Sequence, residues 1–274
     1  MDTIVLKRVY ESIKKNNKIA LVMVTNVKGV TPARVGLSMC VTEDGFTIGT
    51  VGGGKMEFEV VNKSLECLKS GISETFCYKQ EVSEVAKIGD VEIGLFIKVF
   101  NPKEKLLIVG GGHVGFTLYQ IAKSQDFYTV IFDSREEFCN KDRFPEADEL
   151  HVGDIEENLK RYNIDEKCYI VASGHEHKQD EIVVKSCIDR GAKYLGMLGS
   201  SKKIKTIKEN LMKEGISKES LEKVYMPIGL NMGGDSLKEI AFGIFGEILV
   251  VKNNAKIDHM KNIKNKFKYK STFN

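Results

Sequence analysis

The feature that most constrains this chain is a glycine-rich turn between a short apolar run and a helix-period stretch. The apolar run Lys105–Val109 predicts a buried strand, and residues 116–123 repeat apolar side chains at helical spacing. Between them, the spacing G-x-G-x-x-G falls on Gly110, Gly112 and Gly115. This order of strand, turn and helix is typical of an α/β unit that holds a phosphate group against backbone amides.

Each residue of this turn has its own predicted role. Gly110 permits the tight turn, Gly112 lets the backbone approach a phosphate, and Gly115 lets the helix pack against the strand. Gly111 lies between the first two. His113 stands at the helix start, where its ring could face bound phosphate or could only cap the helix.

A carboxylate follows the next strand. The apolar run Thr129–Phe132 ends at Asp133, close to 20 residues after Gly112, where an acid that binds a ribose hydroxyl is expected. We therefore interpret the segment as nucleotide-binding in shape, which does not in itself imply hydride transfer.

Strands and helices continue to alternate through the rest of the chain. We predict strands at residues 168–172 and 194–198, helices at residues 180–190 and 202–213, and a last helix that begins after Asp235 or Ser236. This alternation predicts a Rossmann-like, doubly wound parallel sheet.

Ligands of such sheets bind beyond the carboxyl ends of the strands. His175, Gly199 and Ser200 follow predicted strands, so we expect them to join the glycine turn in one crevice. For His175 the alternative is an exposed loop histidine. His175 and His177 with Asp180 could also hold a metal, but the spacing is loose and no fourth ligand is evident, so we predict no metal site.

The first hundred residues show a different pattern of predicted helices and strands. They predict a smaller α+β domain, with an opening helix, a strand at residues 19–27, a hairpin of strands at 37–42 and 46–50, a helix at 56–69 and a closing strand at 91–100. A polar joint at residues 101–104 follows. We therefore divide the chain into domains 1–100 and 101–254 and a basic tail, 255–274.

This smaller domain has a second glycine loop. Gly52, Gly53 and Gly54 precede a predicted helix, so their amides and the helix dipole can form an anion site. Arg34 could clamp a phosphate there, and Lys55 either adds positive charge or is solvated. The alternative is a long hairpin loop with glycines at positive φ. Two such loops suggest a phosphorylated ligand held between the domains.

Composition excludes several classes of protein. A net charge of +3 gives no argument for nucleic acid, and the lack of a transmembrane-length apolar run or a signal peptide predicts a cytoplasmic protein that binds no membrane. The cysteines form no C-x-x-C pair, so we expect free thiols that pack as small hydrophobic side chains.

Several motifs together resemble the XdhC/CoxI family of xanthine dehydrogenase accessory proteins, over roughly residues 15 to 251. The first block is Gly29-Val30-Thr31-Pro32, Gly36, Met39, Asp44-Gly45, Gly49-Thr50-Val51-Gly52-Gly53-Gly54 and Glu57. The second is the Gly110 loop, Asp133, Arg135, Phe144-Pro145, His175 with Asp180, Gly196-x-Leu198-Gly199-Ser200, Pro227–Leu230, Glu239–Ala241 and Glu247-Ile248.

The resemblance implies a maturation factor. Such proteins bind molybdenum cofactor of the molybdopterin type, assist its sulfuration with a cysteine desulfurase and deliver it to an apo molybdenum hydroxylase. Two positions differ from the family pattern: Ala33 separates Pro32 from Arg34, and Lys55 stands where many relatives carry cysteine.

Two other functions stay open. The glycine turn and Asp133 are also typical of an NAD-dependent oxidoreductase, or of a module that senses NAD or another nucleotide and reports to a partner. A homodimer is a further expectation, because Gly243 and Gly246 would allow close helix packing, although they also suit packing within one chain.

Overall fold

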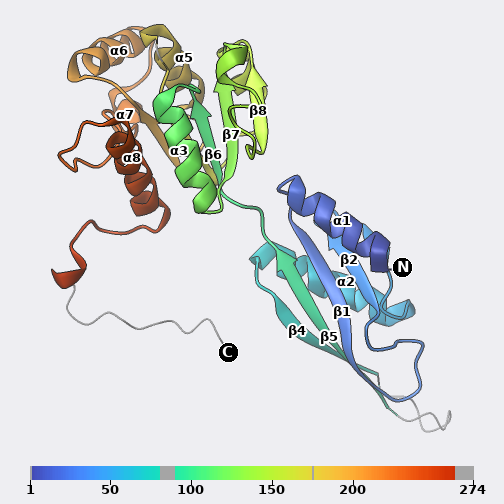
Figure 1. Ribbon diagram of the computed structural model, residues 1–274. Coiled ribbons are helices and arrows are strands. Elements are labelled where there is room, and N and C mark those ends of the chain that lie inside the picture. The colour runs from blue at the N-terminus through green and yellow to red at the C-terminus, as the bar shows by residue number, and fades with distance from the viewer. Residues whose placement is uncertain (1, 81–89, 175, 263–274) are drawn as a thin grey trace. The chain divides into compact units, whose positions relative to one another are not determined.

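The chain divides into two compact units, Met1–Lys103 and Glu104–Asn274 (Figure 1). The computed structural model describes residues 2–80, 90–174 and 176–262. The polar joint predicted at residues 101–104 lies at the division between the units. Each unit has its own sheet and its own apolar core.

The N-terminal unit is built on an antiparallel sheet of order β3-β2-β1-β5-β4. Its strands are β1 (Ile19–Lys28), β2 (Ser38–Thr42), β3 (Thr47–Gly49), β4 (Glu74–Gln80) and β5 (Val91–Phe100). The predicted hairpin is confirmed as β2 and β3. The sequence did not predict β4, because only Phe76 and Tyr78 of this edge strand combine an apolar side chain with partial or full burial.

Two helices cover the two faces of this sheet. Because successive side chains of a strand point to opposite faces, Ala20 packs under α2 (Gly54–Ser70), whereas Ile19 packs under α1 (Asp2–Lys14). The unit is therefore an α+β sandwich, as predicted.

The C-terminal unit has a parallel sheet of order β10-β9-β6-β7-β8. Its strands are β6 (Lys105–Val109), β7 (Tyr128–Asp133), β8 (Glu149–Val152), β9 (Cys168–Ala172) and β10 (Tyr194–Met197). The chain leaves β6 toward β7 and β8 on one side and later adds β9 and β10 on the other. This is the predicted doubly wound Rossmann order.

Helices cover both faces of the parallel sheet, so its central strands are buried on both sides. Leu106 and Ile108 pack toward α3 (His113–Ser124) and α8 (Leu237–Lys252), which lie side by side (Figure 1). Leu107 and Val109 pack toward the opposite layer. That layer contains α4 (Ile155–Arg161), α5 (His177–Cys187), α6 (Ser201–Lys213) and α7 (Lys218–Glu222).

Short 3-10 turns complete the description, at η2 (Glu136–Phe138) and η3 (Met260–Asn262). None of the helices in the described ranges combines the length and the apolar character needed to cross a membrane. Of the basic tail, residues 255–262 are exposed, and residues 263–274 lie outside the described part.

Candidate functional site

The first candidate site lies at the carboxyl edge of the parallel sheet, where the chain turns from β6 into α3. Gly110 has a φ of +116°, and a Cβ there would lie 2.5 Å from the carbonyl oxygen of Ser173, which follows β9. The Ser173 amide in turn donates to the carbonyl of Val109 at 2.8 Å. The predicted tight turn is therefore confirmed, and it lies against the end of the neighbouring strand.

The other two motif glycines differ sharply in their surroundings. A Cβ on Gly115 would lie 2.0 Å from the carbonyl oxygen of Gly110, so only glycine lets α3 pack this close to the turn. A Cβ on Gly112 would meet no atom within 4 Å. The structure thus confirms the packing role of Gly115 and leaves the space above Gly112 open, as a ligand there requires.

Gly111 is held by the rest of the fold. Its amide donates to Asp133 Oδ2 at 2.8 Å, and its carbonyl accepts from Arg143 Nε at 2.8 Å. A Cβ would lie 1.9 Å from the carbonyl oxygen of Phe138. Sequence reasoning missed Arg143, since no local pattern links it to a turn 32 residues earlier.

Asp133 is buried, with 1% of its surface exposed. Oδ1 accepts from the amide and Nε of Arg135 at 3.0 and 2.9 Å, and Oδ2 accepts from Arg135 Nη2 at 3.0 Å as well as from Gly111. Burial alone would raise the pKa of Asp133, but the hydrogen bonds from Arg135 and Gly111 outweigh it and lower the pKa.

Four hydrogen bonds fill the usual acceptor capacity of a carboxylate. A ribose hydroxyl could reach Asp133 only if Arg135 moved away. Contact between Asp133 and a ribose therefore stays a prediction, and the role that the structure gives this side chain is to fix the glycine turn and Arg135.

A pocket of about 320 Å³ opens beside the turn, and we call it the loop pocket. Its walls include Gly112, His113, Arg135, Phe138, Ser173 and Leu237. His113 is exposed and lines this pocket, so its imidazole ring is accessible to a ligand. The volume is at the lower end of the range for small-molecule sites.

The end of β10 serves a different purpose. Ser200 caps α6, since its hydroxyl accepts from the Lys203 amide at 3.3 Å, and Gly199 packs against the Lys203 side chain. Lys203 Nζ forms a buried ion pair with Asp180 and donates to the Leu198 carbonyl at 3.2 Å. Gly199 and Ser200 therefore do not line the loop pocket, contrary to our expectation.

Asp180 also secures the end of β9, because its Oδ1 accepts from the Gly174 amide at 2.8 Å. His175, the next residue, lies outside the described residues, so its predicted ligand role stays a prediction. Within the part of the chain that the structure describes, no cluster of three His, Cys, Asp or Glu side chains could hold a metal ion.

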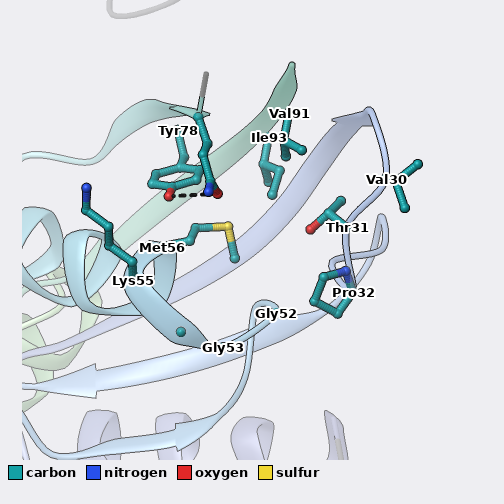
Figure 2. A pocket seen from close by; sticks show the side chains of 12 residues that line it. Val30, Thr31, Pro32, Gly52, Gly53, Lys55, Met56, Tyr78, Val91 and Ile93 are labelled. Carbon is teal, nitrogen blue, oxygen red and sulfur yellow. Dashed lines mark hydrogen bonds between the residues drawn. The ribbon is translucent and has the colours of Figure 1, made fainter. Parts of the chain in front are cut away.

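The second candidate site is a pocket of about 330 Å³ within the N-terminal unit, which we call the N-terminal pocket. Figure 2 shows Tyr78 and Ile93 of the sheet on one side, Val30–Pro32 on another, and Gly52-Gly53 at the base. Met56, at the start of α2, points into the space between them. The sequence thus located this site through its glycines, but not through its apolar wall.

The glycine loop at the base is already occupied by an internal carboxylate. Glu57 Oε2 accepts from the amides of Val51 and Gly53 at 3.2 and 3.1 Å and from the Thr50 hydroxyl at 2.6 Å. An external anion would compete with Glu57 for the Gly53 amide, and the predicted anion site at this loop stays a prediction. The helix α2 begins at Gly54, and its first residues line the pocket. The backbone amides of a first helical turn have no acceptor within the helix, so those of α2 can donate to a ligand.

The two basic side chains predicted for this loop behave differently. Lys55 lines the pocket, although its side chain is 81% exposed and lies 3.9 Å from Glu59. Arg34 is exposed and is not part of the pocket wall. The structure thus brings Lys55, but not Arg34, together with Gly52, Gly53 and Gly54.

The thiols of the chain are poor nucleophiles. Five are buried and Cys77 is exposed, and burial raises the pKa of every one of them, for Cys168 to about 11. Because the thiolate is the reactive form and burial disfavours it, the five buried cysteines act as packing residues, as predicted for most of the thiols, whereas Cys77 lies on the surface.

Known proteins resemble the chain in both units. A family model described as the XdhC Rossmann domain matches residues 106–248, and one described as the XdhC and CoxI family matches residues 12–79. YqeB of Escherichia coli K12 is 27% identical over 246 residues, covering 88% of this chain and 45% of that protein. A protein of Bacillus subtilis 168 that is named as a probable xanthine dehydrogenase subunit is 24% identical over 168 residues, covering 61% and 49%.

The chain spans about half the length of these curated relatives. A solved structure from Bacillus halodurans, named as a xanthine dehydrogenase, superposes with a TM-score of 0.51 at 18% identity, covering 91% of this chain and 96% of that one. At this identity the likeness supports the fold alone.

Proposed function

Because the chain belongs to the XdhC and CoxI family, we propose that it is an accessory factor in the maturation of a xanthine dehydrogenase-type molybdenum hydroxylase. In this proposal it binds molybdenum cofactor, assists its sulfuration with a cysteine desulfurase and delivers it to the apo-hydroxylase. The observation that carries the proposal is that the family models match both units of the chain, over residues 12–79 and 106–248.

The N-terminal pocket is the part of this chain that best suits the pterin of the cofactor. A pterin is a flat ring with polar edges, and the pocket combines the apolar side chains of Met56 and Ile93 with the polar groups of Thr31, Tyr78 and Gln80. Such a mixture of apolar walls and a few polar groups is typical of small-molecule sites.

The molybdenum cofactor itself supplies the redox chemistry of the client enzyme. In our proposal the residues of this chain only hold the pterin and shield it from water. Lys55 and the first amides of α2 would contribute positive potential toward the phosphate of the cofactor.

Assistance with sulfuration then has to work without a thiol of this chain as the sulfur carrier. Lys55 replaces the cysteine that many relatives carry, and burial raises the pKa of the remaining thiols. We therefore propose that the chain presents bound cofactor to the desulfurase, and that the outer sulfur of a persulfide on the desulfurase's own cysteine, rather than any thiol of this chain, is the sulfur source.

The test uses two tryptophan substitutions in one loop. Thr31 lines the N-terminal pocket and its side chain points into it (Figure 2), whereas Val35 is 65% exposed and lies outside the pocket wall, so Thr31→Trp narrows the pocket and Val35→Trp is the control. Each variant is purified from cells that make molybdenum cofactor, and the bound pterin is oxidised, quantified by fluorescence and identified by mass spectrometry.

We expect Thr31→Trp to retain at most about a tenth of the wild-type pterin, the effect of losing roughly 1.4 kcal/mol of binding free energy. Val35→Trp should retain wild-type amounts. Equal pterin content in the two variants, or none in the wild-type chain, would contradict the proposal.

The second candidate function is a nucleotide-sensing module, which the Rossmann strand order and the loop pocket favour. An NAD-dependent oxidoreductase has less support, because Arg135 and Gly111 already occupy the acceptors of Asp133. Hydride transfer from NADH to a small carbonyl compound would support that alternative.

A further inference from the structure

We infer that Arg135 is the anion-recognising side chain of the loop pocket, and that this pocket selects a ligand with a phosphomonoester over one that offers only a ribose hydroxyl. The inference goes beyond the proposed function, since it assigns a second ligand site to the C-terminal unit. It rests on the geometry of Asp133, Arg135 and Phe138 and on the cavity beside them.

The guanidinium of Arg135 is fixed before any ligand binds. Nε and Nη2 donate to the two carboxylate oxygens of Asp133 at 2.9 and 3.0 Å, a side-on contact with two parallel hydrogen bonds. The central carbon Cζ lies 3.8 Å from the centre of the Phe138 ring, so the aromatic face supports the guanidinium plane. Two independent contacts therefore set its orientation.

This side-on contact leaves part of the guanidinium available. Arginine carries five N–H donors, and the pair with Asp133 uses one on Nε and one on Nη2. No described residue accepts a hydrogen bond from Nη1. The side chain is 28% exposed and lines the loop pocket, so its remaining donors are accessible from the cavity.

A phosphomonoester matches this arrangement better than a hydroxyl does. It presents three acceptor oxygens and about two negative charges, and an arginine fork donates to it in pairs. In dinucleotide-binding folds, a free carboxylate after the second strand selects the ribose hydroxyl, whereas a nearby arginine accommodates a phosphate at that position. Here the carboxylate is Asp133, which is buried and fully hydrogen-bonded, and the accessible group is Arg135.

Two acidic side chains oppose the anion. The carboxylates of Glu137 and Glu176 are exposed and interact electrostatically with Arg135. They therefore compete with a phosphate for the guanidinium, so removal of one of them should strengthen binding.

The experiment is calorimetric titration of the full chain at low salt with 2′,5′-ADP and with 5′-AMP, which differ by one phosphomonoester. We expect 2′,5′-ADP to bind at least about tenfold more tightly, as charge-assisted hydrogen bonds predict. Glu137→Gln should increase affinity for 2′,5′-ADP about twofold to threefold, in line with the size of a surface charge interaction.

The double variant Asp133→Asn/Arg135→Gln removes the pair without leaving a buried charge, and it should abolish the preference for 2′,5′-ADP. Arg135→Lys retains the charge but not the fork, and it covers the case in which the double variant does not fold. It should reduce the preference to about a third or less.

The source of the phosphate is distinguished by competition. Displacement of 2′,5′-ADP by isolated molybdopterin indicates the terminal phosphate of a pterin, and displacement by NADP but not NAD indicates a nucleotide. The inference is wrong if 5′-AMP binds as tightly as 2′,5′-ADP, if neither binds, or if the double variant keeps the preference. Each of these outcomes is independent of the pterin content measured in the Thr31→Trp variant.

Discussion

Gly112 and Gly115 belong to one motif, but an alanine should destabilise the fold much more at Gly115 than at Gly112. At Gly115 the new methyl group would lie 2.0 Å from the carbonyl oxygen of Gly110, more than 1 Å inside an ordinary contact. At Gly112, with a φ of −65°, it would meet nothing within 4 Å. The same substitution therefore separates a glycine that serves packing from one that serves access.

The magnitudes follow from these two environments. Overpacking against backbone at Gly115 should cost about 3 kcal/mol, and the better helix propensity of alanine offsets somewhat less than 1 kcal/mol, which leaves about 2 kcal/mol. Gly112 is the N-cap of α3, where alanine is worse than glycine by at most about 1 kcal/mol. For a unit of this size we expect Tm to fall by about 4–8 °C for Gly115→Ala and by less than about 4 °C for Gly112→Ala.

Thermal unfolding of the full chain, followed by circular dichroism, measures both shifts. A third variant, Gly112→Val, should fold like Gly112→Ala yet lose affinity for 2′,5′-ADP, because its side chain fills the open space of the loop pocket. Equal losses of stability in the two alanine variants would contradict the division of roles between these glycines. Wild-type nucleotide affinity in Gly112→Val would contradict the access role of Gly112.

Three further outcomes are expected. Because the pKa of Asp133 is lowered in the folded protein, its contribution to stability is complete above the unfolded pKa of about 3.9 and disappears as pH falls through the folded pKa. Asp133→Asn should therefore reduce the loss of unfolding free energy that the wild-type chain shows below about pH 4. If urea titrations show the same dependence of unfolding free energy on acid pH in both proteins, the pairing of Asp133 with Arg135 is contradicted. Lys203→Met removes the cationic partner of the buried Asp180 carboxylate and should cost about 3–5 kcal/mol, part of which Asp180→Asn/Lys203→Met should restore; a cost below about 1 kcal/mol would show that the ion pair is not buried in solution. Alkylation of the native chain with iodoacetamide near pH 8 should be slow and confined to Cys77, and rapid labelling at any other cysteine, located by peptide mass spectrometry, would contradict the assigned burial of the thiols.

The sequence predicted the elements whose signal is local. Continuous apolar runs identified β6, β7 and β9, because strands covered on both faces contain few polar residues. The same dependence on burial explains why β8 was not predicted, since this edge strand has no buried side chain. The helix α4 was not predicted for another reason: its seven residues are too few to show a helical period.

The candidate sites divide in the same way. Glycine spacing encodes backbone shape over a few residues, so it located both loops. Their partners are tertiary: Arg143 meets the turn across 32 residues, and Lys203 meets Asp180 across 23. Contacts of this kind depend on the complete fold, so the spacing of residues in the sequence does not predict them.

Two expectations about assembly remain predictions. A ligand shared by the two glycine loops is one of them. A homodimer is the other. Gly243 and Gly246 give no argument for it, because the space a Cβ would need at each is taken by Leu230 of the same chain.

Glu57 affects how fast and how tightly the N-terminal pocket would bind the pterin that we propose for it. Its carboxylate organises Thr50, Val51 and Gly53 from within, so the loop is rigid before a ligand arrives. Association then loses little entropy in ordering that segment, and most of the contact energy is available as affinity. Such preorganisation favours binding to a preformed site over binding that requires the loop to fold around the ligand.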